Sequence, residues 1–90
     1  MAQAIVNPED IRRFASTLHQ FNGELRDRLV TLRGLFSALG ESWRDQEQTK
    51  FAEEFNSTME VFNHFSQVSE EHVPFLMRKA EAAQEYLDRR

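Results

Sequence analysis

The chain has 90 residues, 40% of them hydrophobic, and a formal net charge of -4 at pH 7. This length holds one domain, residues 1–90, and the apolar content excludes an intrinsically disordered chain. The acidic charge argues against a nucleic-acid binder, and the absence of cysteine excludes a disulfide framework, thiolate zinc sites and thiol catalysis.

The first ten residues contain neither a basic segment nor an apolar one. We therefore expect no cleaved signal peptide. No later stretch reaches the roughly 18 apolar residues of a membrane-spanning helix, so we expect no stable membrane insertion.

A first helix is predicted over residues 8–39. Asn7 is suited to cap it, Pro8 suits its first position, and the next two residues are acids at the positive end of the helix dipole. Apolar residues then recur at steps of three and four, which is the spacing of a helix and not of a strand. They are Ile11, Phe14, Leu18, Phe21, Leu25, Leu29, Leu32, Phe36 and Leu39.

Residues 40–45 form the predicted turn. Gly40 suits a left-handed cap at the end of the first helix. Two pairs compete for the start of the next helix, Ser42 with Asp45 and Asp45 with Gln48, because each fits a capping box.

A second helix is predicted over residues 46–88. Pro74 has no N–H to donate to the carbonyl of Glu70, so we expect a kink near Pro74. One stripe of this helix carries Phe51, Phe55, Thr58, Phe62, Phe65, Ser69, His72, Leu76, Ala80, Ala83 and Leu87.

The two stripes match when the chain folds back on itself, which predicts an all-α, antiparallel two-helix hairpin. This register pairs Phe36 with Phe51 and Phe21 with Phe65. Residues 8–39 hold five Arg and four acids, whereas residues 46–73 hold one Lys and six Glu, so charge gives a modest further stabilisation.

Further apolar residues lie outside a single helix–helix contact, namely Leu35, Phe36, Met59, Val68, Val73 and Phe75. Two hairpins packed face to face into a four-helix bundle would cover them, although scattered apolar residues can also remain exposed. The candidate core or dimer face comprises Phe14, Leu18, Phe21, Leu25, Leu32, Phe36, Phe51, Phe55, Phe62 and Phe65.

The histidines predict no metal site. His64 and His72 are eight residues apart, about 12 Å along a helix, which is too far to share one ion. His19 could approach His72 across the hairpin, but no further ligand completes a set. We therefore expect neither a metal nor a cofactor.

The acidic pairs predict no catalytic dyad. Glu53 and Glu54, like Glu70 and Glu71, point to different sides of a helix and are expected on solvated faces. The sequence also lacks a glycine-rich loop or a strand-to-helix elbow that would position a nucleophile. The expected class is therefore not an enzyme.

The length, the two helices and the tryptophan in the central turn resemble the WxG-type, or ESAT-like, family of small type VII secretion substrates. The resemblance includes the Asn-Pro-Glu-Asp start and the run Leu-Gly-Glu-Ser-Trp before the second helix. The family motif Trp-x-Gly corresponds to Trp43, Arg44 and Asp45, so the tryptophan is kept and the glycine is replaced. Asp45 can cap a helix, which keeps the turn feasible.

The resemblance implies a homodimer, or a heterodimer with a similar hairpin, that engages a type VII-like secretion machinery. It also implies a protein that is cytoplasmic before export and then secreted. The family's C-terminal Tyr-x-x-x-acid signal is incomplete, because Tyr86 is followed by Asp88 but Arg90 stands where the acid belongs.

Trp43 has two compatible interpretations, a cover over the end of the bundle and a recognition surface for a partner's tail. The first alternative for the whole chain is a generic dimeric adaptor or chaperone without a role in export. The second is a membrane-active amphipathic protein, which the acidic polar faces disfavour.

Overall fold

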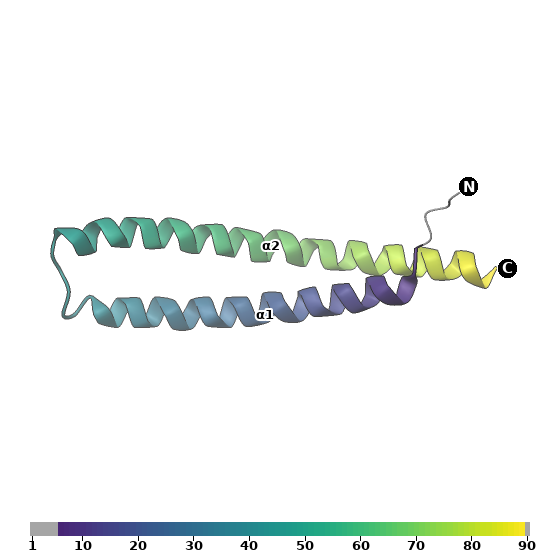
Figure 1. Cartoon of the computed structure of the whole chain (residues 1–90), viewed down its shortest axis with the longest axis horizontal. Coiled ribbons are helices and arrows are strands. Elements are labelled where there is room, and N and C mark those ends of the chain that lie inside the picture. The colour runs from purple at the N-terminus through teal and green to yellow at the C-terminus, as the bar shows by residue number, and fades with distance from the viewer. Residues whose placement is uncertain (1–5, 90) are drawn as a thin grey trace.

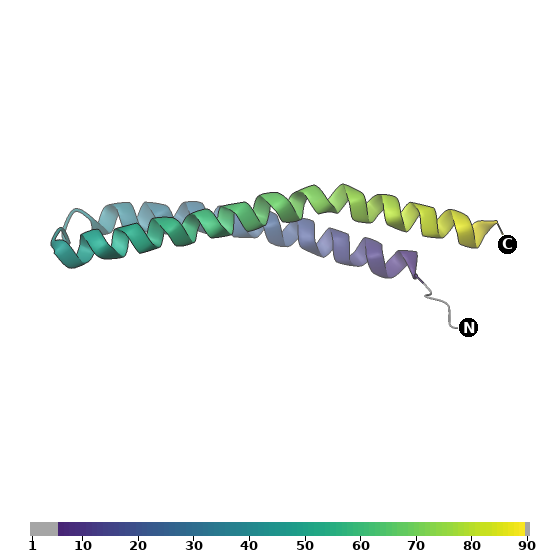
Figure 2. The same cartoon turned by 90° about the horizontal axis from the view of Figure 1, so that it is seen from above.

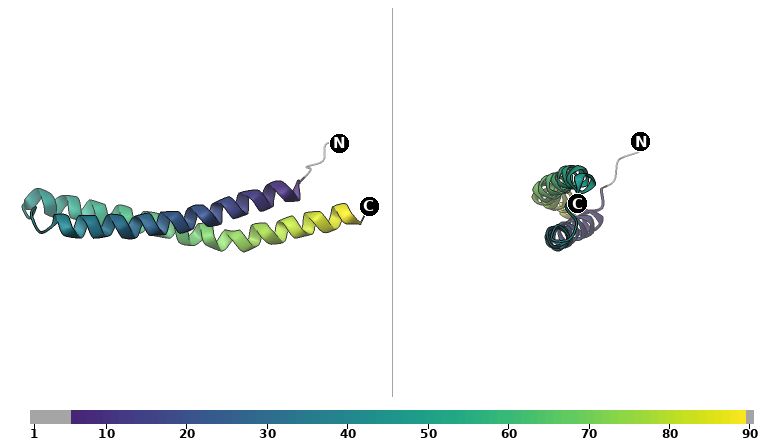
Figure 3. Two further views of the ribbon diagram at one scale, coloured as in Figure 1. Left: turned by 90° about the horizontal axis from the view of Figure 1, so that it is seen from below. Right: turned by 90° about the vertical axis from the view of Figure 1, so that its left-hand side faces the viewer.

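The computed structural model describes residues 6–89, which form two helices, α1 (Pro8–Leu39) and α2 (Gln46–Asp88). The helices run antiparallel and lie side by side as a long, narrow rod (Figure 1). A view along the rod shows only these two helices in cross-section (Figure 3). The predicted all-α helical hairpin is confirmed. Neither helix is long and apolar enough to cross a membrane.

Local capping fixes where α1 begins. The Asn7 side chain accepts a hydrogen bond from the backbone N–H of Glu9 at 2.9 Å, and Pro8 occupies the first turn. Both features were predicted, because they depend only on residues that are neighbours in the sequence.

The predicted left-handed cap at Gly40 is wrong. Gly40 has right-handed backbone angles, φ -64° and ψ -13°, and its N–H donates to the carbonyls of Phe36 and Ser37. The chain continues in right-handed turns up to Trp43, whose N–H donates to the carbonyl of Leu39 at 3.0 Å. These turns satisfy the last carbonyls of α1, so a left-handed residue is not needed.

Of the two predicted starts for α2, the structure has the one at Asp45 with Gln48. The Asp45 carboxylate accepts the backbone N–H of Gln48 at 2.9 Å, and Asp45 has extended backbone angles. Ser42 instead donates its hydroxyl to the carbonyl of Leu39.

The fully buried positions of α1 recur every seven residues, and Met59, Ser66 and Ala80 of α2 fit the same spacing. Most of the fully buried side chains are small or polar. Spacings of seven are typical of helices that coil around each other, and small side chains let their backbones approach closely. The buried residues are Pro8, Ala15, Asn22 and Leu29 in α1 and Met59, Ser66, Ser69 and Ala80 in α2.

This helix–helix interface differs from the predicted one. The predicted register is correct, since the ring centroids of Phe21 and Phe65 lie 6.3 Å apart and those of Phe36 and Phe51 lie 5.7 Å apart. Most of the predicted phenylalanines nevertheless lie beside the interface and not within it. Phe21 directly precedes the buried Asn22, and it points about 100° to the side of that residue.

α2 continues through Pro74 without a break. Its axis changes direction in the light-green part, before the yellow C-terminal part (Figure 2). A proline inside a helix is a common cause of such a change.

Candidate interaction face

One long side of the hairpin carries a set of exposed apolar side chains, which we call the apolar face. Most of its members directly precede a buried interface position or follow one by three residues, so they project to one side of each helix. Leu35 and Phe51 directly precede half-buried positions, Phe36 and Ala52. The edge-on packing of Phe21 against Phe65 shows that the two helices present this side together. The apolar face comprises Phe14, Phe21, Leu32, Leu35, Phe51, Phe62 and Phe65, which are 41–63% exposed.

The structure divides the predicted core or dimer set between two environments. Leu18, Leu25, Phe36 and Phe55 are half-buried between the helices, whereas the other six predicted residues are exposed on the apolar face. Several large apolar side chains exposed on one side of a protein are typical of a protein–protein contact and untypical of an isolated monomer.

The opposite side of the hairpin carries hydrogen bonds between the helices, and we call this group the central polar layer. The carboxylate of Glu70 accepts the Nδ2 amide of Asn22 at 3.0 Å and lies 2.5 Å from Nδ1 of His19. Arg26 donates to the hydroxyl of Ser66 at 3.2 Å. Asn22 is completely buried, and its Oδ1 has no partner among the described residues.

The expectation that Glu70 lies on a solvated face is wrong. Its side chain is only about one third exposed, at 32%, because it reaches across to α1, whereas its neighbour Glu71 is exposed as expected. His19 contacts this carboxylate. No group of three His, Cys, Asp or Glu that could hold a metal ion occurs within residues 6–89.

Sequence reasoning missed Asn22 and Ser66 as buried residues, whereas the buried Ser69 was on the predicted stripe of the second helix. The polarity of Asn22 and Ser66 removed them from the predicted stripes, which the largest side chains defined instead. The available signal was the seven-residue repeat Ala15, Asn22, Leu29 and Phe36, which runs beside the phenylalanines.

The central polar layer predicts that acid destabilises the hairpin. The hydrogen bond from Asn22, followed by that from His19, lowers the pKa of Glu70 below its ordinary value of 4.5. A carboxylate with a lowered pKa stabilises the fold above its unfolded pKa, and this stabilisation is lost as the pH falls through the folded pKa. When the pH is lowered from 7 to below about 4, the melting temperature of the native chain should therefore fall further than that of Glu70→Gln. Equal losses in the two proteins would contradict this role.

Four aromatic side chains gather where the helices meet the turn. The ring centroids of Phe36 and Phe55 lie 4.5 Å apart, and those of Phe51 and Phe55 lie 5.9 Å apart. Trp43 is half-buried, and its ring centroid lies 6.1 Å from that of Phe51. We call Phe36, Trp43, Phe51 and Phe55 the turn-end aromatic cluster.

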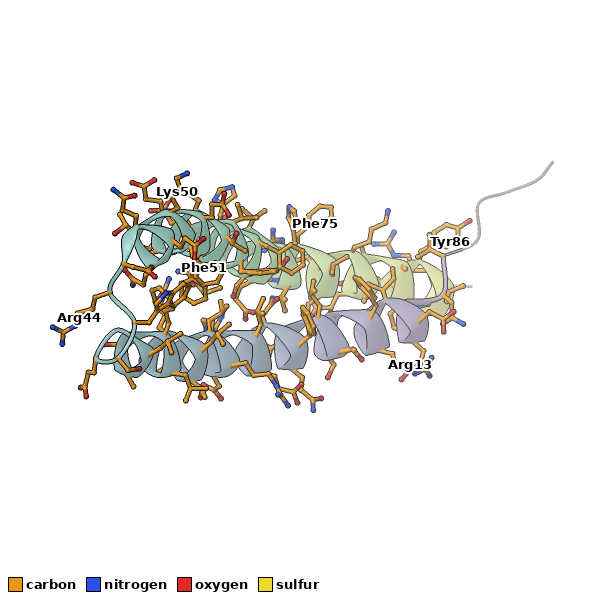
Figure 4. All side chains as sticks on the ribbon, turned by 60° about the vertical axis from the view of Figure 1, so that its left-hand side comes forward. Arg13, Arg44, Lys50, Phe51, Phe75 and Tyr86 are labelled. Atoms are coloured by element: carbon orange, nitrogen blue, oxygen red, sulfur yellow. The ribbon has the colours of Figure 1, made fainter. Side chains whose placement is uncertain are left out.

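Arg44 and Asp45 complete the turn around this cluster. Nε of Arg44 donates to the carbonyl of Gly40 at 2.8 Å, and the rest of the side chain points away from the hairpin (Figure 4). Asp45 caps α2, so the third motif position is a helix N-cap in this chain. Glycine and aspartate are both accepted as N-caps, which explains how one can replace the other.

The capping role of Asp45 gives a prediction that separates two substitutions. Asp45→Ala should lower the free energy of unfolding by about 1 kcal/mol, whereas Asp45→Gly should lower it by only a few tenths. Chemical denaturation of the three proteins would measure both effects. An Asp45→Gly variant less stable than Asp45→Ala would show that the position has another requirement.

The far end of the hairpin carries the predicted tail residues. Tyr86 is 71% exposed and projects from α2 (Figure 4). Asp88 is also exposed, and its carboxylate accepts the Nε2 amide of Gln84 at 3.1 Å. Both side chains are thus accessible to a partner.

Comparisons with known proteins agree with this geometry. The family model described as "Proteins of 100 residues with WXG" matches residues 3–86. The chain is similar to crystal structures of the secreted protein EsxB from Bacillus anthracis str. Sterne. For one point mutant of that protein the TM-score is 0.78 at 25% identity, with 94% of this chain and 96% of that chain covered. For the wild-type protein the TM-score is 0.75 at 25% identity, with 93% of this chain and 97% of that chain covered. No curated protein matches the sequence.

Proposed function

The chain belongs to the WXG100 family of ESAT-like helical hairpins in type VII secretion, and we propose that it acts there, without catalysis, as one half of a four-helix bundle. The apolar face carries this proposal. A second hairpin packed on that face would convert its exposed phenylalanines into a core. The similarity to a secreted protein supports the same pathway.

A lone hairpin of this sequence has little core of its own. The buried hydrophobic residues within the described part of the chain are Ala15, Leu29, Met59 and Ala80, and two of these are alanines. Burial of apolar surface is the main favourable term in folding, so covering the apolar face would add a large share of the stability. Folding and association are therefore coupled in this proposal.

The proposed partner is a second copy of this chain or a similar small hairpin, and the proposed machinery is a type VII-like secretion system. The bundle would assemble in the cytoplasm and leave the cell without removal of a signal peptide. A generic dimeric adaptor or chaperone would have the same bundle but would remain inside the cell.

Export is tested by expressing the chain in its host with the secretion ATPase intact or deleted. The expected result is chain in the medium only when the ATPase is present, with a cytosolic protein measured in parallel as a control for lysis. Chain that stays in the cells of both strains would support the adaptor and contradict the export role.

The incomplete tail signal gives a further prediction. Because the acid expected four residues after Tyr86 is replaced by Arg90, the partner's tail should supply the complete signal. Deleting residues 87–90 should therefore leave both dimerisation and export intact. A divergent machinery that reads Tyr86 and Asp88 differently is the alternative. Loss of export with normal dimerisation would favour this alternative and overturn the partner's role.

A further inference from the structure

Glu70 lies at a weak point in the backbone of α2. Pro74, four residues later, cannot donate a hydrogen bond to the Glu70 carbonyl, and its ring crowds that carbonyl. The neighbouring part of α2 is where its axis changes direction (Figure 2). A helix that lacks one of its internal hydrogen bonds bends more easily at that turn than elsewhere.

The side chain of the same residue holds this weak point to α1. Both oxygens of the Glu70 carboxylate are engaged, Oε1 by the Nδ2 amide of Asn22 and Oε2 by Nδ1 of His19. Asn22 is completely buried, so its amide cannot exchange this partner for solvent without opening the interface. The charged hydrogen-bond acceptor of the central polar layer thus lies at the turn where α2 bends.

The part of α2 that follows, residues 75–88, has few fully buried side chains, and we call it the C-terminal arm. Its last turns extend past the start of α1 (Figure 1). Ala80 is fully buried and Leu76, Ala83 and Gln84 are half-buried, whereas Phe75, Met77 and Tyr86 are exposed. Phe75 and Tyr86 both point away from α1 (Figure 4). Segments with few buried contacts open locally at low free energy.

We propose that residues 70–74 form a hinge in α2 and that Glu70, bonded to Asn22 and His19, is the latch that holds the C-terminal arm against α1. When the latch is closed, the arm continues the rod. When it opens, the arm swings about the turn that lacks the helix hydrogen bond, while the part of α2 before residue 70 stays packed. This device is independent of export and of the tail signal, and it controls the direction in which the arm presents Phe75 and Tyr86.

Hydrogen exchange of the full chain, resolved by peptide, tests the latch. Glu70→Ala removes both hydrogen bonds to α1, and Glu71→Ala is the matched control, because it removes an exposed carboxylate one residue away. In Glu70→Ala, the exchange rate of residues 75–85 should rise by a factor of roughly ten or more. This is the size expected when hydrogen bonds to a charged acceptor are lost. Residues 50–62 should be accelerated clearly less than residues 75–85, and Glu71→Ala should match the native chain throughout.

Pro74→Ala tests the hinge separately, because it restores the N–H that donates to the Glu70 carbonyl. Combined with Glu70→Ala, it should return the exchange of residues 75–85 toward the native rate. Equal acceleration in residues 50–62 and 75–85 of Glu70→Ala would mean that Glu70 only stabilises the whole fold, and the latch would be wrong. Identical rates in Glu70→Ala and Glu71→Ala would also overturn the latch, and an unchanged rate after adding Pro74→Ala would overturn the hinge.

Discussion

Replacing Phe21 by aspartate should dissociate the four-helix bundle. Phe21 lies near the middle of the apolar face, where its ring packs edge-on against Phe65, and 48% of the residue is exposed. A second hairpin would bury that exposed part, and the substitution would place a charge there instead. Losing a buried aromatic costs about 4 kcal/mol, so the dissociation constant should rise by about a thousandfold.

If association and folding are coupled, as proposed, the Phe21→Asp variant should also lose helical circular dichroism at micromolar concentration. Val30→Asp is the matched control, since Val30 is 68% exposed on α1 outside the apolar face. That variant should dimerise like the native chain. A Phe21→Asp protein that is still dimeric and fully helical would mean that the apolar face is not the interface.

The second large effect is expected at the turn. Trp43→Ala should lower the free energy of unfolding by about 3 kcal/mol, which is the lower limit of the usual range for truncating a large buried aromatic. The lower limit applies because Trp43 is only half-buried, against Phe51. Chemical denaturation measures this change. Trp43 is the only tryptophan, so a blue-shifted fluorescence maximum in the native chain would report its packing directly.

Tyr86→Ala serves as the control for the Trp43 measurement. It also truncates an aromatic side chain, but Tyr86 is 71% exposed on the C-terminal arm. Its effect on stability should stay within about 0.5 kcal/mol, as for other exposed positions. A Trp43→Ala variant as stable as Tyr86→Ala, together with a water-like emission maximum, would leave Trp43 only a role in recognition.

Local chemistry made much of the hairpin predictable from the sequence. Asn7 and Asp45 cap the helices that follow them, and capping depends on neighbours in the chain. The short turn then limits the register, which is why Phe21 and Phe65 were correctly paired. Gly40 was misjudged because glycine permits a left-handed cap but does not require one.

The helix–helix interface was harder to predict, because spacings of three and four describe a broad apolar side rather than its centre. In this chain the largest side chains lie beside the interface, and small ones such as Ala15 and Ser66 occupy it. Two exposed sides of the hairpin then acquire different properties, one apolar and one polar. That separation is the structural reason to expect a single partner surface.

Glu70 shows the limit of reasoning along one helix. Next to Glu71 it has the sequence signature of a solvated face, and its actual environment depends on which residues of α1 lie opposite. The positions of Asn22 and His19 on α1 make Glu70 an interhelical acceptor. Polar residues buried between helices are therefore assigned from the three-dimensional register and not from hydropathy.

The central claim is that a second hairpin covers the apolar face. Size-exclusion chromatography with light scattering on the purified chain tests it most directly, and circular dichroism on a dilution series follows folding in the same samples. The account predicts about twice the chain mass of 10.6 kDa at micromolar concentration, with helicity falling as the protein is diluted. A particle with the mass of one chain that is fully helical and melts cooperatively at the same concentration would contradict it.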